Sequence, residues 1–290
     1  MMTEEFFTKA TPRLKGYCIS DDQISTLKAC IEGQTTVEEA TQVLTAYPSA
    51  SSTPLELQQR LGGLWTLLIT TAVGLLDAQP TIISILKRIR TLPWEEEPTG
   101  EGEGFMDFDD GFFWRELTDW ASSWADDYNH YGAQYLIEKS EGKGREKRQE
   151  EWINANTFAA RLASTGDRII ALCGAALDTA EYITMGDLEK KDHETDPGCI
   201  EAPAQLFIHA APELLCLVRA DPTAKDIHSV WSQHERCLLA KEKDESGDKW
   251  KDWRKKWARL AEMESLPERT REISRKALEA MDQAKQQDIH

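Results

Sequence analysis

Hydrophobic residues recur along most of the chain at alternating steps of three and four, the spacing that places side chains on one face of an α-helix. Together with start and stop signals, this spacing predicts helices over 20–33, 35–47, 54–76, 80–93, 114–138, 150–164, 165–184, 201–218 and 225–243, and a helical hairpin from Trp250 to Met281. No segment alternates between apolar and polar positions, as a half-buried strand would. The fold is therefore predicted to be all-α, a single multi-helix bundle of about ten helices.

Caps and prolines sharpen several of these boundaries. Ser20 followed by Gln23 forms a capping box at the start of a helix. Pro54 and Pro80 stand where helices begin, a position that needs no backbone N–H. Pro212 lies inside an apolar helical pattern, where proline removes a donor and crowds the preceding turn. We therefore expect Pro212 to kink that helix or to end its first segment.

Three polar stretches interrupt the helical spacing and are predicted to be flexible loops. They are the acidic, glycine-rich stretch 95–104, the polar linker 139–148, and the stretch 186–200. We predict one all-α domain over residues 1–290. A division into subdomains 1–138 and 149–290, at the second linker, stays open.

The composition is that of a globular protein with a strongly acidic balance. The chain has 290 residues, 40% of them hydrophobic, and a formal net charge of −17. Nucleic acids and anionic lipid surfaces bind clustered Lys and Arg, so neither is expected as a partner. The longest uncharged run, from Leu61 to Leu76, is too short to span a membrane.

The N-terminus and the cysteines indicate a compartment. The first residues include acids early and contain no long apolar segment, so no secretory signal is expected. The six cysteines include no C-x-x-C pair and no zinc spacing with histidine. We expect free thiols and a cytoplasmic location. Nothing in the sequence indicates the oligomeric state.

The segment EEWINANTFAARLAS places polar side chains beside an apolar helix face. On a helical projection, Asn156 falls on the face that contains Trp152, while Asn154 and Arg161 lie at its border. A buried Asn needs hydrogen-bond partners, which either a backbone carbonyl or a ligand could provide. The sequence favours a packing role, and Asn156 and Arg161 are the candidate binding residues if a pocket opens here.

The same segment also carries a family resemblance. Its motif W-x-N-x-N-x-F-x-A-R-L, which begins at Trp152, resembles the central signature of an uncharacterised ascomycete family catalogued only as a domain of unknown function. Three other stretches resemble segments of that family: DGFFWRELTDWAS, FIHAAPELL and the Trp-rich hairpin WKDWRKKWARLAEMESLPERTREISRKALEAM. The N-terminal third matches only in helical pattern. The resemblance implies an intracellular, helical, fungal-type protein, and it implies no activity and no catalytic residues.

A first catalytic candidate is the sequence DFDD, which begins at Asp107 and resembles the D-x-D-D proton-donor motif of class II terpene cyclases. Those enzymes are all-α and stabilise carbocations with aromatic faces. An aspartic acid protonates carbon only if burial and neighbours favour its acid form, so Asp109 would need such surroundings. The alternative is that Asp109 or Asp110 caps the following helix. The sequence favours this alternative, because a match of only four residues is weak evidence for the cyclase motif.

A second candidate lies on the predicted helix 114–138, where aromatic residues and carboxylates are neighbours. Its apolar stripe contains Trp124, and its flank contains Trp120 and Asp127. Asp127 would then be catalytic, with Trp120 and Trp124 as binding residues, and such a flank could bind Mg²⁺ through carboxylate oxygens. The alternative is a helix with a wet edge. The sequence contains no metal-ligand motif and no evident cofactor motif.

A third candidate is His209, which lies in an apolar helical pattern with Glu213 one turn away. If a pocket opens between helices, the two side chains form an acid–base pair, with His209 catalytic and Glu213 in the binding site. The alternative, which the sequence favours, is a hydrogen-bonded histidine in the core.

These observations leave two classes of function. In the first, a hydrophobic small molecule is bound, or is converted by a cyclase or isomerase reaction, in an aromatic-lined pocket between helices. In the second, the chain is a non-catalytic module whose acidic surface and Trp-rich hairpin contact a protein partner. The aromatic stripe with its carboxylate flank favours the first. The two classes differ in where the candidate side chains should lie. If one cavity contains all of them, the first class is favoured, and if they face solvent or separate parts of the core, the second is. The residues are Asp109, Trp120, Asp127, Asn156 and His209.

Overall fold

The computed structural model describes residues 3–102, 104, 107–137, 142–167, 169–170, 181, 184–186, 188, 196–219 and 247–287. Within these ranges the chain forms 11 α-helices and several short 3-10 helices, and no strand. The predicted all-α fold of about ten helices is confirmed. Most of the predicted helix 165–184 and all of the predicted helix 225–243 lie outside the described residues.

The chain divides into two compact units, residues 1–133 and 134–290, here called the N-terminal and C-terminal units. The prediction of one domain over residues 1–290 stays a prediction. The helices of the N-terminal unit, including α7, which continues past residue 133, are α1 (Thr3–Leu14), α2 (Asp21–Ile31), α3 (Val37–Ser49), α4 (Pro54–Gly74), α5 (Gln79–Ile89), α6 (Phe113–Glu116) and α7 (Trp120–Ile137).

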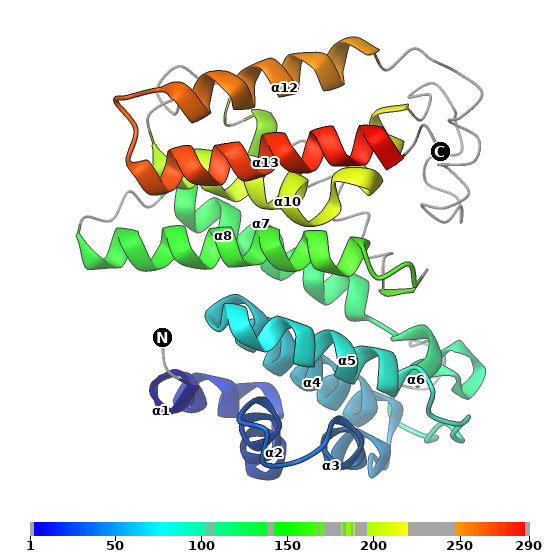
Figure 1. Cartoon of the computed structure of the whole chain (residues 1–290). Helices are drawn as coiled ribbons and strands as arrows, with labels where there is room; N and C mark the ends of the chain where they lie inside the picture. The colour runs from blue at the N-terminus through cyan, green and yellow to red at the C-terminus, as the bar shows by residue number, and fades with distance from the viewer. Residues whose placement is uncertain are drawn as a thin grey trace. The chain divides into compact units, whose positions relative to one another are not determined.

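Helices α1 to α5 build the larger part of the N-terminal unit. Helix α3 packs against α2, α4 and α5, and α1 packs against α2 and α4 (Figure 1). The predicted capping box of Ser20 and Gln23 is confirmed at the start of α2, and Pro54 stands in the first turn of α4 as predicted. The apolar α4 buries most of its length because other helices lie on several of its sides.

A glycine in α4 allows one of these close approaches. A Cβ atom added to Gly63 would lie 2.3 Å from the backbone oxygen of Tyr17 and 2.8 Å from that of Cys18. Gly62, the adjacent residue, has nothing within 4 Å of the same position. Gly63 therefore lets the backbone that follows α1 pack directly on α4.

The predicted helix 114–138 is interrupted near its start. Helix α6 ends at Glu116, and α7 begins at Trp120. Between them, Leu117 and Asp119 adopt left-handed backbone angles, with φ of 51° and 64°. The indole N–H of Trp65 donates to the carbonyl oxygen of Thr118 (2.8 Å), so a contact with α4 satisfies backbone that the break exposes. The prediction of one continuous helix is wrong here.

The acidic segment after α5 contains no helix over residues 95–102, in agreement with the expected loop. It is nevertheless held by hydrogen bonds: the N–H of Gly111 donates to Glu97 (2.7 Å), and the N–H of Leu55 donates to the carbonyl of Glu101 (3.1 Å). The indole of Trp94 donates to the carbonyl of Asp110 (2.8 Å). Gly111, at φ 83°, has no side chain to collide with Trp94 at this approach.

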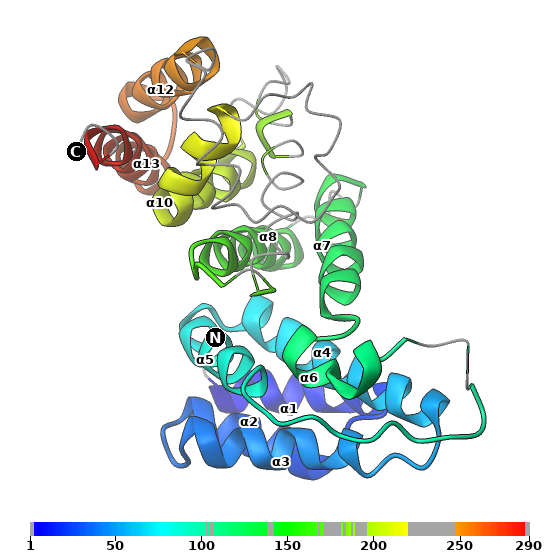
Figure 2. The same cartoon turned by 90° about the vertical axis from the view of Figure 1, so that its right-hand side faces the viewer.

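The C-terminal unit contains α8 (Lys143–Ala163), α10 (Pro197–Arg219), α12 (Gly247–Glu262) and α13 (Glu268–Gln287). Helix α10 packs against α8 and against α13, and α12 pairs with α13 as the predicted hairpin (Figure 2). Phe207 of α10 meets the tryptophans of α12, with ring centroids 5.3 Å from Trp253 and 5.4 Å from Trp257. The Trp-rich stripe is therefore a packing surface within this unit.

Two predicted loops of this unit are partly helical. A loop was predicted over residues 139–148. Helix α8 begins at Lys143, so residues 143–148 form the first turns of this helix. Charged residues at helical spacing support these turns, for example Lys147 with Glu151 one turn later (3.2 Å). Helix α10 begins at Pro197, inside the stretch predicted as a loop at 186–200. In both places polarity indicated a loop, although an exposed helix surface is equally polar.

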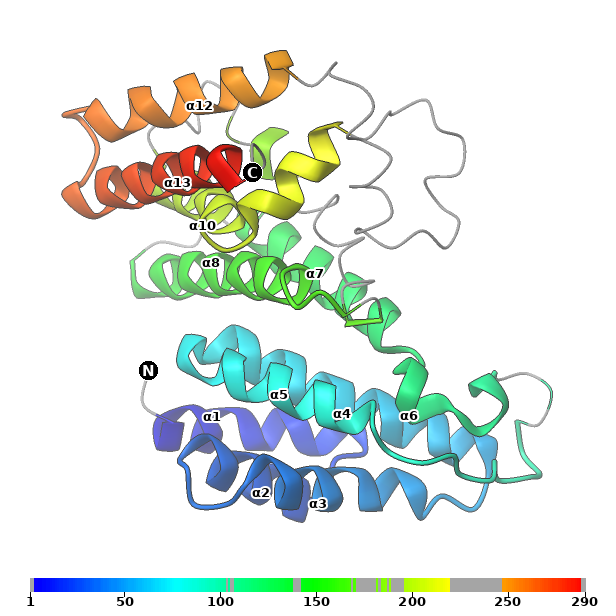
Figure 3. The same ribbon diagram turned by 45° about the vertical axis from the view of Figure 1, so that its right-hand side comes forward.

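Helix α10 is kinked as predicted. Ala210 has non-helical angles (φ −144°, ψ 32°), so α10 consists of two segments (Figure 3). Pro212 lacks the N–H that would bind the carbonyl of Ile208, which explains a break at this place. The kink separates His209 in the first segment from Glu213 in the second.

The cysteines agree only in part with the expected free thiols. Cys18, Cys30 and Cys199 are free. Cys216 is disulfide-bonded, so the expectation is wrong at that position. Spacing along the chain does not reveal which cysteines tertiary packing brings within bonding distance. Cys173 and Cys237 lie outside the described residues.

In the part of the chain that the structure describes, no helix has the length and apolar character that crossing a bilayer requires.

Candidate functional site

Asp109 does not have the surroundings that the cyclase interpretation requires. It lies in a 3-10 helix (Asp109–Gly111) and is exposed. Its carboxylate accepts a hydrogen bond from the hydroxyl of Thr118, and its N–H donates to Asp107 (2.9 Å). The alternative of a helix cap is wrong, because the cap residue of α6 is Phe112, and no side chain caps that helix. Asp109 therefore belongs to the hydrogen bonds that hold the turn before α6.

The predicted binding residues Trp120 and Trp124 lie in the core of the N-terminal unit. They are 1% and 0% exposed. The ring of Trp120 packs edge-on against Trp65 with centroids 5.5 Å apart, and Trp124 contacts Tyr128 at 5.7 Å. Rings at these distances contact one another directly. The contact of Trp120 with Trp65 joins α7 to α4, whereas the contact of Trp124 with Tyr128 lies within α7.

Asp127 is half-buried on α7. Burial raises the pKa of its carboxyl group, and the nearby charges of Arg13 and His130 oppose that rise. The predicted catalytic role of Asp127 stays a prediction, as does Mg²⁺ binding. Among the described residues, no three His, Cys, Asp or Glu side chains gather in a way that could hold a metal ion.

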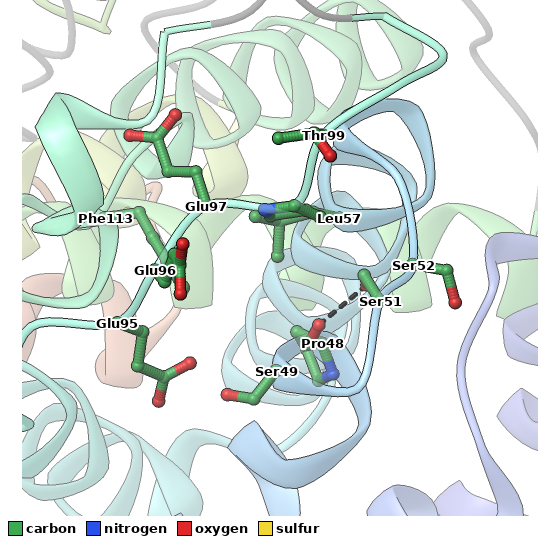
Figure 4. A pocket seen from close by; sticks show the side chains of 11 residues that line it. Pro48, Ser49, Ser51, Ser52, Leu57, Glu95, Glu96, Glu97, Thr99 and Phe113 are labelled. Atoms are coloured by element: carbon green, nitrogen blue, oxygen red, sulfur yellow. Dashed lines mark hydrogen bonds between the residues drawn. The ribbon is translucent and has the colours of Figure 1, made fainter.

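An open cleft of about 400 Å³ lies in the N-terminal unit, between the α3–α4 turn and the acidic segment. Figure 4 shows Glu95, Glu96 and Glu97 on one wall and Ser49 and Ser51 on the other. Its walls are mainly polar, so it differs from the aromatic-lined pocket that the sequence predicted. None of the predicted site residues lines it.

In the C-terminal unit, the predicted residues Arg161 of α8 and His209 of α10 influence each other electrostatically. His209 is half-buried and makes no hydrogen bond within the described part of the chain. Burial lowers the pKa of its imidazole to about 4, and the charge of Arg161 on α8 contributes to this lowering. The imidazole is therefore neutral at pH 7. Arg161 and His209 are neighbours, although 48 positions separate them in the chain.

Glu213 stands one turn beyond His209, across the kink. Burial raises the pKa of its carboxyl group, while a hydrogen bond from its own backbone N–H lowers it by less. Its other oxygen, Oε2, is buried and has no hydrogen-bond partner among the described residues. A buried oxygen without a partner is rare in folded proteins, because its desolvation is not compensated. His209, four positions earlier in the sequence, lies on the other side of the break at Ala210.

Asn156 is fully buried, and its amide donates to the carbonyl of Trp152 one turn earlier in α8 (2.9 Å). This bond lies within its own helix, and the predicted binding role of Asn156 stays a prediction. Asn154, expected at the border of the apolar face, is only 4% exposed. It shares a helix face with Thr157 and Arg161, at steps of three and four.

The sequence analysis did not predict a buried polar interaction between α10 and α13. Glu201 is 4% exposed, and its carboxylate accepts a hydrogen bond from the hydroxyl of Thr270 (2.7 Å) and lies 3.2 Å from the guanidinium of Arg269. The available signal was a single acid directly before the apolar stretch of α10. The partners on α13 are distant in sequence, so the pattern alone does not reveal them.

The structure is an all-α helical-bundle protein in which His209 and Glu213 stand on either side of the kink of α10, and one buried oxygen of Glu213 has no hydrogen-bond partner among the described residues. A model of the family "Protein of unknown function (DUF3632)" matches residues 65–257, more than half of the chain, and the chain belongs to this family. The matched region includes α8, α10 and the kink. The resemblance to a domain of unknown function is thereby confirmed. Neither the curated proteins nor the solved structures contain a match to the chain.

Proposed function

We propose that the chain binds a hydrophobic small molecule at the α10 kink and isomerises it by proton transfer that involves His209 and Glu213. One observation carries the proposal: at the kink of α10, Oε2 of Glu213 is buried and has no hydrogen-bond partner among the described residues. His209 lies four positions earlier in the sequence, on the other side of the kink. A buried oxygen of this kind destabilises a fold unless a ligand completes it.

The pKa values of the two groups support proton transfer. Environments that push the pKa values of neighbouring groups away from their ordinary values are typical of acid–base sites. Here burial lowers the pKa of His209 and raises that of Glu213. The rise at Glu213 moves its pKa toward the pH at which a carboxyl group exchanges protons most effectively, whereas His209, with a pKa of about 4, stays neutral near pH 7 and would serve as a hydrogen-bond donor.

The apolar surroundings support a hydrophobic ligand. Helices α8 and α10 pack together and bury mainly apolar side chains, among them Phe158 and Leu206, which are fully buried. Among the chemistries considered, isomerisation fits better than cyclisation started by Asp109, because Asp109 is exposed.

A thermal-shift screen tests the proposal. The panel contains hydrophobic metabolites, prenyl diphosphates and Mg²⁺, and a ligand that binds only the folded state raises the melting temperature. We expect a shift with at least one hydrophobic compound that disappears in His209→Gln and Glu213→Gln. Glu264→Gln, which removes one exposed carboxylate with the same charge change, is the matched control and keeps the shift. A shift that survives both site variants would refute binding at the kink.

A second candidate is the non-catalytic interaction module, and the polar cleft of the N-terminal unit favours it. Three glutamates line that cleft in a chain of net charge −17, so a basic segment of a protein partner would fit its chemistry. Titration with a lysine-rich peptide, followed by isothermal titration calorimetry, tests this candidate. Binding that weakens when Glu95 and Glu96 are changed to Gln would support it.

The cytoplasmic location and the ascomycete origin that the sequence suggested are retained as proposals.

A further inference from the structure

We propose that the polar cleft of the N-terminal unit binds a small linear amine that carries two or more positive charges. The cleft has a volume of about 400 Å³ and lies between the α3–α4 turn and the acidic segment. It belongs to a different unit from the α10 kink, and no residue of that kink lines it. The inference therefore goes beyond the proton transfer proposed at the kink and assigns a second ligand.

The acidic wall of the cleft lacks a compensating charge. Glu95, Glu96 and Glu97 line the cleft, and none of the described residues that line it is Lys, Arg or His. Elsewhere in the same unit carboxylates are paired, for example Glu56 with Arg60. Three like charges in a row repel one another, and a recess between two walls focuses their field, so a cation is attracted into the cleft.

This wall is held in place without a ligand. The N–H of Glu95 donates to the carbonyl of Gly111 (3.1 Å), and the N–H of Gly111 donates to the carboxylate of Glu97 (2.7 Å). The two bonds fix the segment on either side of Glu96. A wall that is already ordered lowers the entropic cost of binding. The carboxylates of Glu95 and Glu96 hold no such bond and are the ones available to a ligand.

The opposite wall favours a cation independently of the glutamates. Helix α3 ends at Ser49, which lines the cleft, so the negative end of the helix dipole lies there. The positive end of α4 nearby is already met, because Glu56 accepts a hydrogen bond from the N–H of Ser52 (2.7 Å). Figure 4 shows Ser49 and Glu95 pointing toward each other. One ammonium group between them could donate to both oxygens.

The shape of the cleft indicates the ligand class. The glutamates follow one another along the chain and span up to about 7 Å, so the matching positive charges are spread along a chain. Leu57 and Phe113 also line the cleft and offer apolar contact to methylene groups between those charges. The volume is that of a small-molecule site, whereas a stable protein interface buries more than about 1,000 Å². A free amine therefore fits better than the lysines of a protein partner.

Isothermal titration calorimetry of the full-length protein with spermidine, at low salt, tests the inference. We expect one site per chain. Ser49→Lys places a fixed ammonium group in the cleft and should weaken binding at least about tenfold. Ala50→Lys is the matched control, because Ala50 is the next residue, is also exposed and does not line the cleft. The control adds the same charge and should keep the affinity.

A second pair of variants tests the acidic wall. Glu95→Gln combined with Glu96→Gln should weaken spermidine binding about 3- to 30-fold, because each change removes one charged contact. Glu264→Gln combined with Glu279→Gln changes the net charge equally at exposed positions of the C-terminal unit and should leave the affinity unchanged. Glu97 is left intact, because its carboxylate holds Gly111.

Four outcomes would overturn the inference. An affinity that is the same in the two cleft variants and in their controls would exclude the cleft as the site. Hexylamine, which has one charge, would have to bind more weakly than spermidine, and equal binding would refute the need for separated charges. A lysine-rich peptide that binds more tightly and displaces spermidine would assign the cleft to a protein partner. Displacement by an equal concentration of Mg²⁺ would refute an organic cation.

Discussion

At the scale of single residues, the most informative side chains are polar groups whose burial is not compensated. Oε2 of Glu213 is buried and has no hydrogen-bond partner among the described residues, and burial lowers the pKa of the imidazole of His209. Asn156 and Thr157, by contrast, are fully buried and donate to carbonyls one turn earlier in their own helix. The contrast separates groups that packing satisfies from groups that a ligand would satisfy.

Glu213→Gln is expected to stabilise the protein at neutral pH. Burial raises the pKa of Glu213 above its ordinary value of 4.5, so ionisation favours the unfolded chain as pH rises through and beyond that value. The neutral amide removes this loss, and we expect a gain of about 1 kcal/mol at pH 8, since partial exposure screens the charge. Urea unfolding at pH 4 and pH 8 measures it, with Glu264→Gln as control. Equal gains at both pH values would contradict the explanation.

His209 is expected to destabilise the fold in acid. Its pKa in the folded protein is about 4, against an ordinary 6.5, so the unfolded chain binds the proton first as pH falls from 6.5 to 4. The loss should reach about 1–3 kcal/mol over this window and be absent from His209→Gln. NMR titration of the imidazole gives the pKa directly. A midpoint near 6.5 would show that the side chain is hydrated.

At the scale of elements, helices in this protein are shaped by what packs against them. The backbone that follows α1 packs against α4 at Gly63, and α10 bends near Pro212. The helix predicted over residues 114–138 is interrupted between α6 and α7. Gly63 and Pro212 are local sequence signals for the first two features, whereas the break between α6 and α7 has no such signal.

Gly63→Ala and Gly62→Ala form a matched pair on α4. The Cβ that Gly63→Ala adds would collide with backbone oxygen, which has no rotamer to relieve the contact, so a cost of about 1–3 kcal/mol is expected. The same change at Gly62 meets no atom within 4 Å and gains helix propensity of up to about 1 kcal/mol. Thermal unfolding of both variants measures the difference. Similar melting temperatures would mean that the contact after α1 is loose.

Thr270→Val tests the tie between α10 and α13. The isosteric change removes the hydroxyl that donates to the buried carboxylate of Glu201, and we expect a loss of about 1–3 kcal/mol. The control is Thr157→Val, where a buried hydroxyl donates within its own helix (2.9 Å) and a smaller loss is expected. Denaturant unfolding compares the two. A larger loss at Thr157 would contradict the assigned role of Glu201.

At the scale of the whole molecule, the chain forms two compact units with separate cores. Trp65 and its aromatic neighbours lie in the core of one, and Phe207 with the tryptophans of α12 lies in the core of the other. A compact unit with its own core is able to unfold cooperatively by itself.

Calorimetry is therefore expected to resolve two unfolding transitions. Leu27 and Leu260 are 0% exposed and lie in the cores of the N-terminal and C-terminal units. Leu27→Ala should lower the melting temperature of the first unit only, and Leu260→Ala that of the second only. Each change should cost about 2–5 kcal/mol within its own unit. A single transition that both variants lower equally would instead support the prediction of one domain over residues 1–290.

Much of the fold followed from local pattern. The helical periods, the capping box at Ser20, the kink near Pro212 and the Trp-rich hairpin could all be predicted, because each depends on residues within one or two turns. The break before Trp120 and the helical start of α8 at Lys143 could not. Left-handed angles at Leu117 have no sequence signature, and polar helix surfaces look like loops.

The sequence by itself determined the all-α class, the helix faces and the list of candidate residues. These follow from the type of each residue and from the spacing of residues three and four positions apart, which can be read without knowing the tertiary structure. Only the tertiary structure decided how deeply each candidate is buried and which charges lie near it. It buried Trp120 and Trp124 among other rings, left Asp109 exposed, and brought Arg161 beside His209. Burial and charge at a side chain depend on elements far away in the chain, and it is these that set the pKa of His209 and leave an oxygen of Glu213 bare.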